Sequence, residues 1–337
     1  MSDPSTILRR LDAWARDDRP SYEQAFVDLC LPTLLAPLVR LALLCWRPLA
    51  AGDLAQQPWH RQLTSAAASL AGELAAADGA AGGEIAAGGR GEERAASDRA
   101  MLARRGALPA RLACDLALGP LLKHAVTHSW DVFSLRQTRQ LVAAVGSAAG
   151  EAKALAAASA LGWQLSSAGA TQQEPEAAEA AEAAAGAVKE LVMQVARKLD
   201  EAADACCVPP CVGGEGAEAA AAAAAARRQL WRALKLAAVM GEWSGLLASG
   251  PLQELLGGLI AGRVLPYLRA SLAAGQELPV IAACEAAARA IPAGWRQRDA
   301  SGAFPLCTLS LAAFVAGECA PRVDVERVAP LRQSLGC

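Results

Sequence analysis

Apolar residues recur at helical spacing along most of the chain, and the densest run spans residues 21–49. Ser21 and Gln24 have the spacing of a capping box, which predicts the start of a helix. Pro32 suits the first turn of a helix better than its interior, so we expect a second helix to begin there and Pro48 to end it. The sequence therefore predicts two helices joined at a proline turn, with an inward-facing stripe made of Phe26, Leu29, Cys30, Leu34, Leu35, Leu38, Leu41 and Leu44.

Three further stripes with a helical period follow later in the chain, and no segment shows the alternation expected of a β-strand. The stripes predict amphipathic helices, so the expected fold class is all-α, a multi-helix domain. They consist of Val188, Leu191, Val192, Val195 and Leu199; of Leu236, Val239, Met240, Trp243 and Leu247; and of Leu255, Leu256, Leu259, Ile260 and Val264.

Pro32, Pro120 and Pro266 each stand between apolar helical halves, which would suit stacked helical pairs in an α-solenoid. Three unrelated helices that begin or kink at proline are the simpler explanation, because no fixed period separates the prolines. An α-solenoid-like arrangement is thus one form that the all-α domain could take.

Three segments, 66–105, 150–186 and 206–226, are rich in alanine and glycine and poor in large apolar residues. Such composition is typical of loops or of solvated alanine helices, since a packed core needs larger side chains. We therefore expect one helical domain over residues 1–337, into which these three segments are inserted.

The composition favours helices and gives no general attraction for nucleic acid. Hydrophobic residues make up 54% of the chain but aromatic residues only 4%, and the net charge is −2 with a pI near 6.0. The ten cysteines are expected to be free thiols in a reducing compartment, because no signal-peptide core follows Met1 and several of them stand in apolar surroundings. Residues 29–46 approach the length of a membrane span, but Pro32, Pro37 and Arg40 interrupt them, so no membrane helix is expected.

Residues that could support catalysis are sparse. His124 and His128 are four residues apart, with Asp131 and Cys114 as conceivable further metal ligands, but no HExxH pattern surrounds them. The cysteines at 206, 207 and 211 lack a second ligand pair and are expected to lie in an exposed loop without a metal. The glycine pairs at 82–83, 88–89 and 213–214 do not form phosphate loops, and no GxSxG elbow occurs. We expect no catalytic residue, no metal, no cofactor and no small-molecule substrate.

Arg228, Arg232 and Lys235 are spaced to lie along one face of a helix that also carries Trp231. This basic stripe could contact RNA phosphates or an acidic partner helix, or it could simply be a solvated helix face. Tryptophans are more often core anchors than platforms for nucleic-acid bases, and we expect this of those at positions 14, 46, 59, 130, 231, 243 and 295.

Ordered blocks of Trp, Pro and Leu carry a resemblance to a known family. The first block contains Tyr22, Cys30, Pro32, Pro37, Arg40, Trp46 and Pro48; Trp130 and Asp131, then Trp231 and Trp243, and finally Trp295 follow in order. These blocks resemble the C-terminal domain of the GC-rich-sequence DNA-binding factor (GCF) family. Thr33 departs from the pattern, because a lysine usually follows that proline, and Phe26 stands where a tyrosine is common.

The resemblance implies a non-catalytic scaffold in the nucleus. It implies a role in pre-mRNA splicing, in the disassembly of the intron-lariat spliceosome, with spliceosomal or G-patch-type proteins as partners. The alternative is a DNA-binding transcriptional regulator, although no helix here carries the clustered Arg, Asn or Gln that read base edges.

Overall fold

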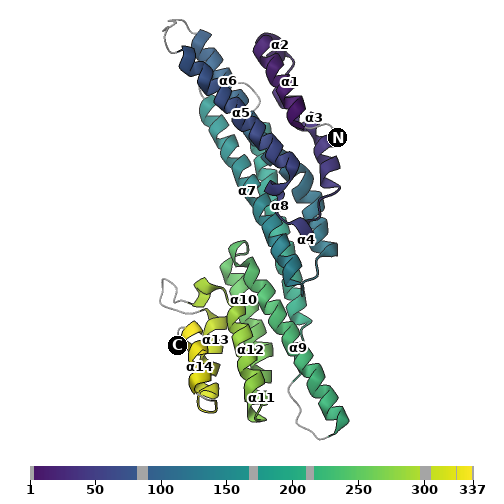
Figure 1. Ribbon diagram of the computed structural model, residues 1–337, viewed down its shortest axis with the longest axis vertical. Helices are drawn as coiled ribbons and strands as arrows, with labels where there is room; N and C mark the ends of the chain where they lie inside the picture. Colours follow the sequence, from purple (N-terminus) through teal and green to yellow (C-terminus); the bar gives the residue numbers. More distant parts are fainter. Residues whose placement is uncertain are drawn as a thin grey trace. The chain divides into compact units, whose positions relative to one another are not determined.

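The computed structural model describes residues 4–81, 90–166, 174–209, 216–296, 305–323 and 325–335. Every element in these ranges is helical and none is a strand, which confirms the prediction of an all-α multi-helix protein (Figure 1). The glycine pairs at 82–83, 88–89 and 213–214, and Cys211, lie outside the described residues.

The described residues divide into two compact units. Unit 1 comprises Met1–His128 and Ala143–Leu191, and unit 2 comprises Ser129–Val142 and Val192–Cys337. The boundaries fall inside α7 (Leu135–Ser166) and α8 (Glu174–Asp204), so each of these long helices supplies residues to both units. A single domain with inserted segments stays a prediction.

Unit 1 is a bundle in which α5 packs against both α1 and α6, and α3 packs against α6 (Figure 1). Apart from its parts of α7 and α8, it is built from α1 (Pro4–Asp17), α2 (Arg19–Gln24), α3 (Val27–Leu43), α4 (Pro48–Ala51), η1 (Leu54–Gln56), α5 (Pro58–Ala81), α6 (Arg90–Ala113), η2 (Cys114–Leu122) and η3 (Ala125–Ser129).

The proline turn predicted at Pro32 was wrong, because the chain breaks earlier. The start of the first helix was also misplaced: α2 begins at Arg19, and the Asp18 carboxylate accepts a hydrogen bond from the Ser21 amide at 3.2 Å. The break lies at Phe26, whose φ of 50° is left-handed, and Pro32 sits inside α3. An interior proline costs about 3 kcal/mol, but α3 continues because one of its faces is buried over its whole length.

The buried face of α3 is not the predicted stripe. Leu35 is buried as expected, but its companions in the core are Leu31, Val39 and Leu43. Both faces of this helix are apolar, so hydrophobic spacing alone could not identify the inner one. The predicted residues that lie exposed instead are Phe26, Leu29, Cys30, Leu34, Leu41 and Leu44.

The sequence predicts loops or solvated helices for the alanine-rich segments, but one of these segments contributes to a packed core. One cluster in unit 1 joins Ala110 of α6, Cys114 of η2, Ala152 and Leu155 of α7, and Ala181 and Ala184 of α8. Small side chains let helix backbones approach closely, and alanine loses no rotamer freedom on burial. Two helices of the insert predicted at 150–186 thus pack against each other and against α6 and η2, largely through methyl groups.

A buried charge network connects α1, α3 and α6 in unit 1. The Arg105 guanidinium is 3% exposed and lies 2.9 Å from the Asp12 carboxylate and 3.1 Å from that of Asp28. The Tyr22 hydroxyl donates to Asp28 at 2.6 Å and accepts from Arg105 at 2.9 Å. Burial raises the pKa of Asp12, although the neighbouring Arg105 opposes that shift. The ion pairs offset charges that would otherwise be costly to bury, although Nη1 of Arg105 is buried without a hydrogen-bond partner.

Unit 2 gathers the C-terminal helices around α9 and α12 (Figure 1). Apart from its parts of α7 and α8, it is built from α9 (Ala217–Glu242), η4 (Trp243–Gly245), α10 (Ser249–Leu259), η5 (Ile260–Val264), α11 (Leu265–Ala273), α12 (Glu277–Ala290), η6 (Ala293–Arg296), α13 (Leu306–Phe314), η7 (Val315–Cys319) and α14 (Val325–Leu335). The stripe predicted from Leu236 to Leu247 is buried throughout.

Two features fix the positions of α7 and α9 in unit 2. The rings of Trp130 and Trp243 meet edge to face at 5.6 Å between centroids, and Trp130 donates through Nε1 to the Thr138 hydroxyl at 3.1 Å. Gly241 of α9 lies against α12, where a Cβ would collide with the Ala290 carbonyl oxygen. The absence of a side chain at 241 therefore sets the distance between α9 and α12.

One helical segment, Leu135–Ser159, is long and apolar enough to cross a membrane by length and composition alone. A third of the window that meets this test, 33%, is buried inside the protein. Core helices of water-soluble proteins meet the same criterion, so we draw no membrane assignment from it.

Candidate functional site

The outer face of α9 carries an exposed tryptophan among basic side chains. Trp231 is 41% exposed, so the expectation that it anchors the core was wrong. The helical period explains this, since Leu230, Ala233 and Leu234 occupy the buried face and turn position 231 outward. The predicted basic stripe lies on the same side as Trp231, with Arg228, Arg232 and Lys235 all exposed.

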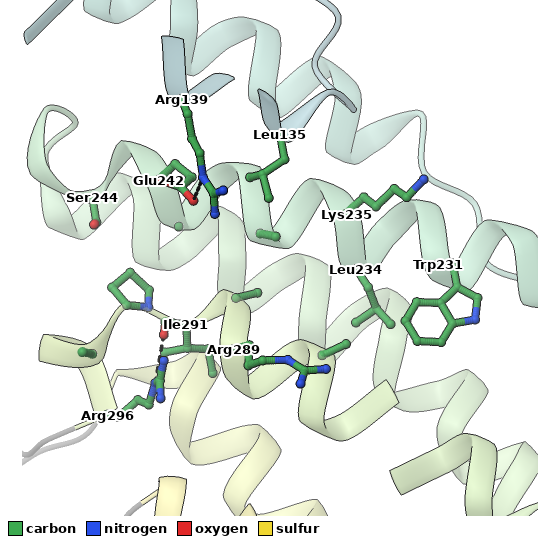
Figure 2. Close-up of a pocket in the computed structure, with 16 residues that line it drawn as sticks. Leu135, Arg139, Trp231, Leu234, Lys235, Glu242, Ser244, Arg289, Ile291 and Arg296 are labelled. Atoms are coloured by element: carbon green, nitrogen blue, oxygen red, sulfur yellow. Dashed lines mark hydrogen bonds and ion pairs between the residues drawn. The ribbon is translucent and has the colours of Figure 1, made fainter. Parts of the chain in front are cut away.

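A hollow of about 630 Å³ lies beside Trp231 where α9 meets the start of α7 and the end of α12 (Figure 2). Its lining is largely aliphatic, and its charged side chains project from several elements. The aliphatic lining comprises Leu135, Leu234, Ala238, Ala286, Ala290, Ile291, Pro292 and Ala293.

A second hollow of about 580 Å³ is lined by the same tryptophan. Trp231 and Lys235 line both hollows, so the two are neighbours, and we call them together the Trp231 groove. The second hollow is also lined by Asp131, Phe133, Ala224, Arg227, Arg228 and Arg232.

The groove is strongly basic, although the chain as a whole is slightly acidic. Among its described lining residues, two carboxylates, Asp131 and Glu242, face seven cationic side chains. The cations are Arg139, Arg227, Arg228, Arg232, Lys235, Arg289 and Arg296. Concentrated positive charge of this kind attracts an anionic partner.

Three of the arginines are held in place by contacts within unit 2. Arg139 donates through Nε to Glu242 at 2.9 Å, and Arg296 donates to the Ile291 carbonyl oxygen at 2.9 Å (Figure 2). The guanidinium of Arg232 lies 4.1 Å from the centroid of the Phe133 ring. Such contacts leave donor groups free at the rim of the groove, because each guanidinium has five N–H groups.

Six of the seven cations carry no ion pair with the described part of the chain, and four of these six, Arg227, Arg228, Lys235 and Arg289, make no side-chain hydrogen bond or ring contact there either. Sequence reasoning identified the stripe on α9 but missed Arg139, Arg289 and Arg296. These three come from α7, α12 and η6, and no local pattern indicates that those elements converge on Trp231.

The residues of the family resemblance are not uniformly in the core. Tyr22, Trp46, Trp130 and Trp243 are buried, whereas Pro32, Pro48 and Trp295 are half-buried. The exposed members are Cys30, Pro37, Arg40, Asp131 and Trp231, of which Cys30 and Trp231 had been expected to pack inside. Trp14, which had also been expected in the core, is 36% exposed.

The candidate metal ligands are only partly brought together. The His124 and His128 rings lie 4.9 Å apart on an exposed surface of unit 1. Across the described ranges, no group of three His, Cys, Asp or Glu side chains is placed to hold a metal ion. Cys207 is exposed as expected, but the expectation was wrong for Cys206, which is 2% exposed in the turn that ends α8, where its backbone N–H donates to the Ala203 carbonyl oxygen at 3.1 Å.

Unit 1 presents a second candidate surface, the outer face of α3. Leu34 is 54% exposed, Leu41 is 49% exposed and Leu44 is 80% exposed, and Phe26 and Leu29 continue the same side toward the start of the helix. We call this set the α3 stripe. A row of large apolar side chains in solvent is typical of a surface that binds another protein.

Comparisons with known proteins confirm the resemblance to the GCF family. The chain is 30% identical over 137 residues to mouse "Intron Large complex component GCFC2", which covers 40% of this chain and 15% of the relative. It is 28% identical over 141 residues to Arabidopsis thaliana "Transcriptional repressor ILP1". That match covers 42% of this chain and 13% of the relative. It is 41% identical over 59 residues to human "PAX3- and PAX7-binding protein 1". That match covers 17% of this chain and 6% of the relative.

The similarity therefore concerns a limited part of much longer proteins, since the matches span 15% or less of the length of these three relatives. No protein-family model matches the chain.

Proposed function

Because this chain is similar to members of the GCF family, we propose that it is a non-catalytic, nuclear interaction domain that acts in pre-mRNA splicing. The observation that carries the proposal is the 30% identity over 137 residues to a protein named as a component of the intron large complex. Within splicing, we assign the chain to the disassembly of the intron-lariat spliceosome. There it would hold spliceosomal or G-patch-type proteins in place.

The described surfaces support a role in binding rather than in chemistry. The α3 stripe exposes leucines that a partner could bury, and each buried leucine side chain contributes about 1.5–3 kcal/mol. A rigid helical scaffold positions such a surface without needing catalytic groups.

The test is recovery of splicing complexes from nuclear extract on the full, tagged chain. We expect enrichment of spliceosomal proteins, measured by mass spectrometry, and of excised lariats, measured by reverse transcription across the branch point. A variant with Leu41→Ser and Leu44→Ser should lose most of both, because it places hydroxyl groups in the α3 stripe. The matched control is Leu278→Ser with Leu309→Ser, which alters two leucines of unit 2 that are exposed to a similar degree, 62% and 54%.

Failure to enrich lariats with the unmodified chain would contradict the splicing role. Equal recovery by the two double variants would leave the splicing role in place and would remove the α3 stripe from it.

A second candidate function is transcriptional repression, favoured by the similarity to the plant protein named as a transcriptional repressor. If the chain binds DNA through the Trp231 groove, the affinity for a GC-rich duplex should fall steeply with salt, since each phosphate contact releases a counterion. An electrophoretic mobility assay at several salt concentrations tests this, and a charge-reversed groove variant should then lose binding.

A further inference from the structure

We propose that the Trp231 groove binds an acidic amphipathic helix of a partner protein. The inference rests on the proposed function only in treating the chain as an interaction domain, and it adds the chemistry of one partner. The groove is defined by its lining residues, by its basic rim and by Trp231, which lines both of its hollows.

The charge distribution selects an anionic partner. Seven cationic side chains face two carboxylates in the groove, and one of these, Glu242, is already paired with Arg139. Six cations of the groove make no ion pair in the described structure, so they can pair with carboxylates of a ligand without breaking an existing ion pair. A cationic or neutral ligand would leave these charges unmatched.

The lining of the first hollow selects a peptide over a nucleic acid. Its aliphatic side chains, which include Leu135, Leu234 and Ile291, offer no donors or acceptors to base edges (Figure 2). Nucleic acids bind through phosphate contacts and stacking of bases on several aromatic rings. Here Trp231 is the exposed aromatic ring, and the guanidinium of Arg232 covers Phe133 at 4.1 Å. A leucine or an aromatic side chain of a peptide would fill the hollow and bury its lining.

The dimensions fit a short helix. The charged residues that line the groove from α9 run from Arg227 to Glu242, which corresponds to about 22 Å along a helix. A partner helix of about 15 residues spans that length. One face would place apolar residues at i, i+3, i+4 and i+7 against Trp231 and the aliphatic lining, and its flanks would carry Asp or Glu toward the cations.

The experiment begins with selection of ligands from a library of random 16-residue peptides displayed on phage and panned on the purified full chain. We expect enriched peptides to be acidic, with large apolar residues at helical spacing. The best of them is then labelled, and its affinity is measured by fluorescence anisotropy.

Two variants test the site. Trp231→Ala removes the ring that lines both hollows, and the triple variant Arg228→Glu, Arg232→Glu, Lys235→Glu reverses the stripe. We expect each to weaken binding at least tenfold while circular dichroism shows an unchanged helix content. The matched control reverses three exposed arginines that line neither hollow, Arg263, Arg322 and Arg327, and should bind as the unmodified chain does.

Several results would overturn the inference: no enrichment, enriched peptides without acidic bias, or equal binding by the groove variants and the control. Tighter binding of a 15-nucleotide oligouridine than of the best peptide, lost in the same variants, would assign the groove to RNA instead. Because these measurements use purified chain and synthetic ligands, they fail or succeed separately from the splicing experiment.

Discussion

The backbone conformation of Phe26 separates α2 from α3, so one residue decides this helix boundary. Its left-handed φ of 50° is tolerated by glycine but strongly disfavours β-branched residues. We therefore expect Phe26→Val to be less stable than Phe26→Gly by about 1–2 kcal/mol, although valine is the better match in hydrophobicity. The free energies of unfolding of the two variants, measured by urea denaturation, give the difference.

Leu34 provides the control, because it is exposed in the regular part of α3. There the order should reverse, with Gly less stable than Val by a few tenths of a kcal/mol, since glycine is the poorer helix former. The same order at both positions would contradict the left-handed assignment of Phe26.

We expect the ionisation of Tyr22 to make the free energy of unfolding depend on pH in the alkaline range. Burial raises the pKa of Tyr22 above its ordinary value of 10.0, and its hydrogen bond to Asp28 acts in the same direction. The folded chain thus keeps this proton to higher pH than the unfolded chain does. The stabilisation is complete below pH 10 and is lost as the pH rises above that value, by up to about 1.4 kcal/mol per pH unit.

The measurement compares the unmodified chain with Tyr22→Phe by denaturant unfolding between about pH 9 and 11.5. The difference in free energy of unfolding should shrink as the pH rises, because the variant lacks the group that titrates. A difference that stays constant across this range would show that Tyr22 ionises as easily in the folded chain as in the unfolded one.

At the scale of helices, Gly241 controls how closely α9 packs on α12. Gly241→Ala should destabilise the protein by about 1–3 kcal/mol, because the new methyl group collides with the Ala290 carbonyl oxygen and forces the helices apart. Thermal unfolding followed by circular dichroism measures the effect.

Gly258 in α10 serves as the matched control, since a Cβ there meets no atom within 4 Å. Gly258→Ala should raise stability by about 0.5–1 kcal/mol, as expected for alanine in place of glycine inside a helix. Equal effects at the two positions would contradict the close approach at Gly241.

The presence of helices was predictable from the sequence, but the face of each helix that is buried was not always predictable. The stripes from Leu191 to Leu199 and from Leu236 to Leu247 have one apolar side each, so their period identified the core. In α3 both sides are apolar, and burial was decided by contacts with α6, which the local sequence does not contain. The proline turn failed for the same reason, because packing of Leu31 and Leu35 outweighs the cost of Pro32 inside the helix.

The candidate site was predictable only in part, for a related reason. The spacing of Arg228, Trp231, Arg232 and Lys235 places them on one side of a helix whatever surrounds it. The arginines from α7, α12 and η6 reach the groove through tertiary packing, which a helical period cannot reveal. The exposure of Trp231 likewise follows from what covers the rest of α9.

At the scale of the whole molecule, the thiols give a direct test of which surfaces are exposed. The background must lack Cys211 and Cys337, which fall outside the described residues, so both are replaced by Ser. In that variant three thiols should react rapidly with Ellman's reagent, those of Cys30, Cys45 and Cys207. Five should react only on unfolding, those of Cys114, Cys206, Cys284, Cys307 and Cys319.

The physical reason is restricted access, and for Cys114 also a small fraction of thiolate, because burial raises the pKa of Cys114 to about 12. Rapid reaction of Cys206 would place the end of α8 in solvent and contradict its burial. Mass spectrometry of the modified peptides identifies which thiol has reacted.

The alanine cluster of unit 1 has a consequence for how its helices are aligned. Methyl groups are alike, so a helix that slides by one turn exchanges one alanine contact for another with little loss of packing. Uniqueness of alignment must therefore come from side chains that cannot be exchanged in this way. In unit 1 such side chains include His60, 2.9 Å from Glu151, Lys123, 2.6 Å from Glu190, and Arg105 between Asp12 and Asp28. Polar pairs, more than apolar ones, then specify the register of this bundle.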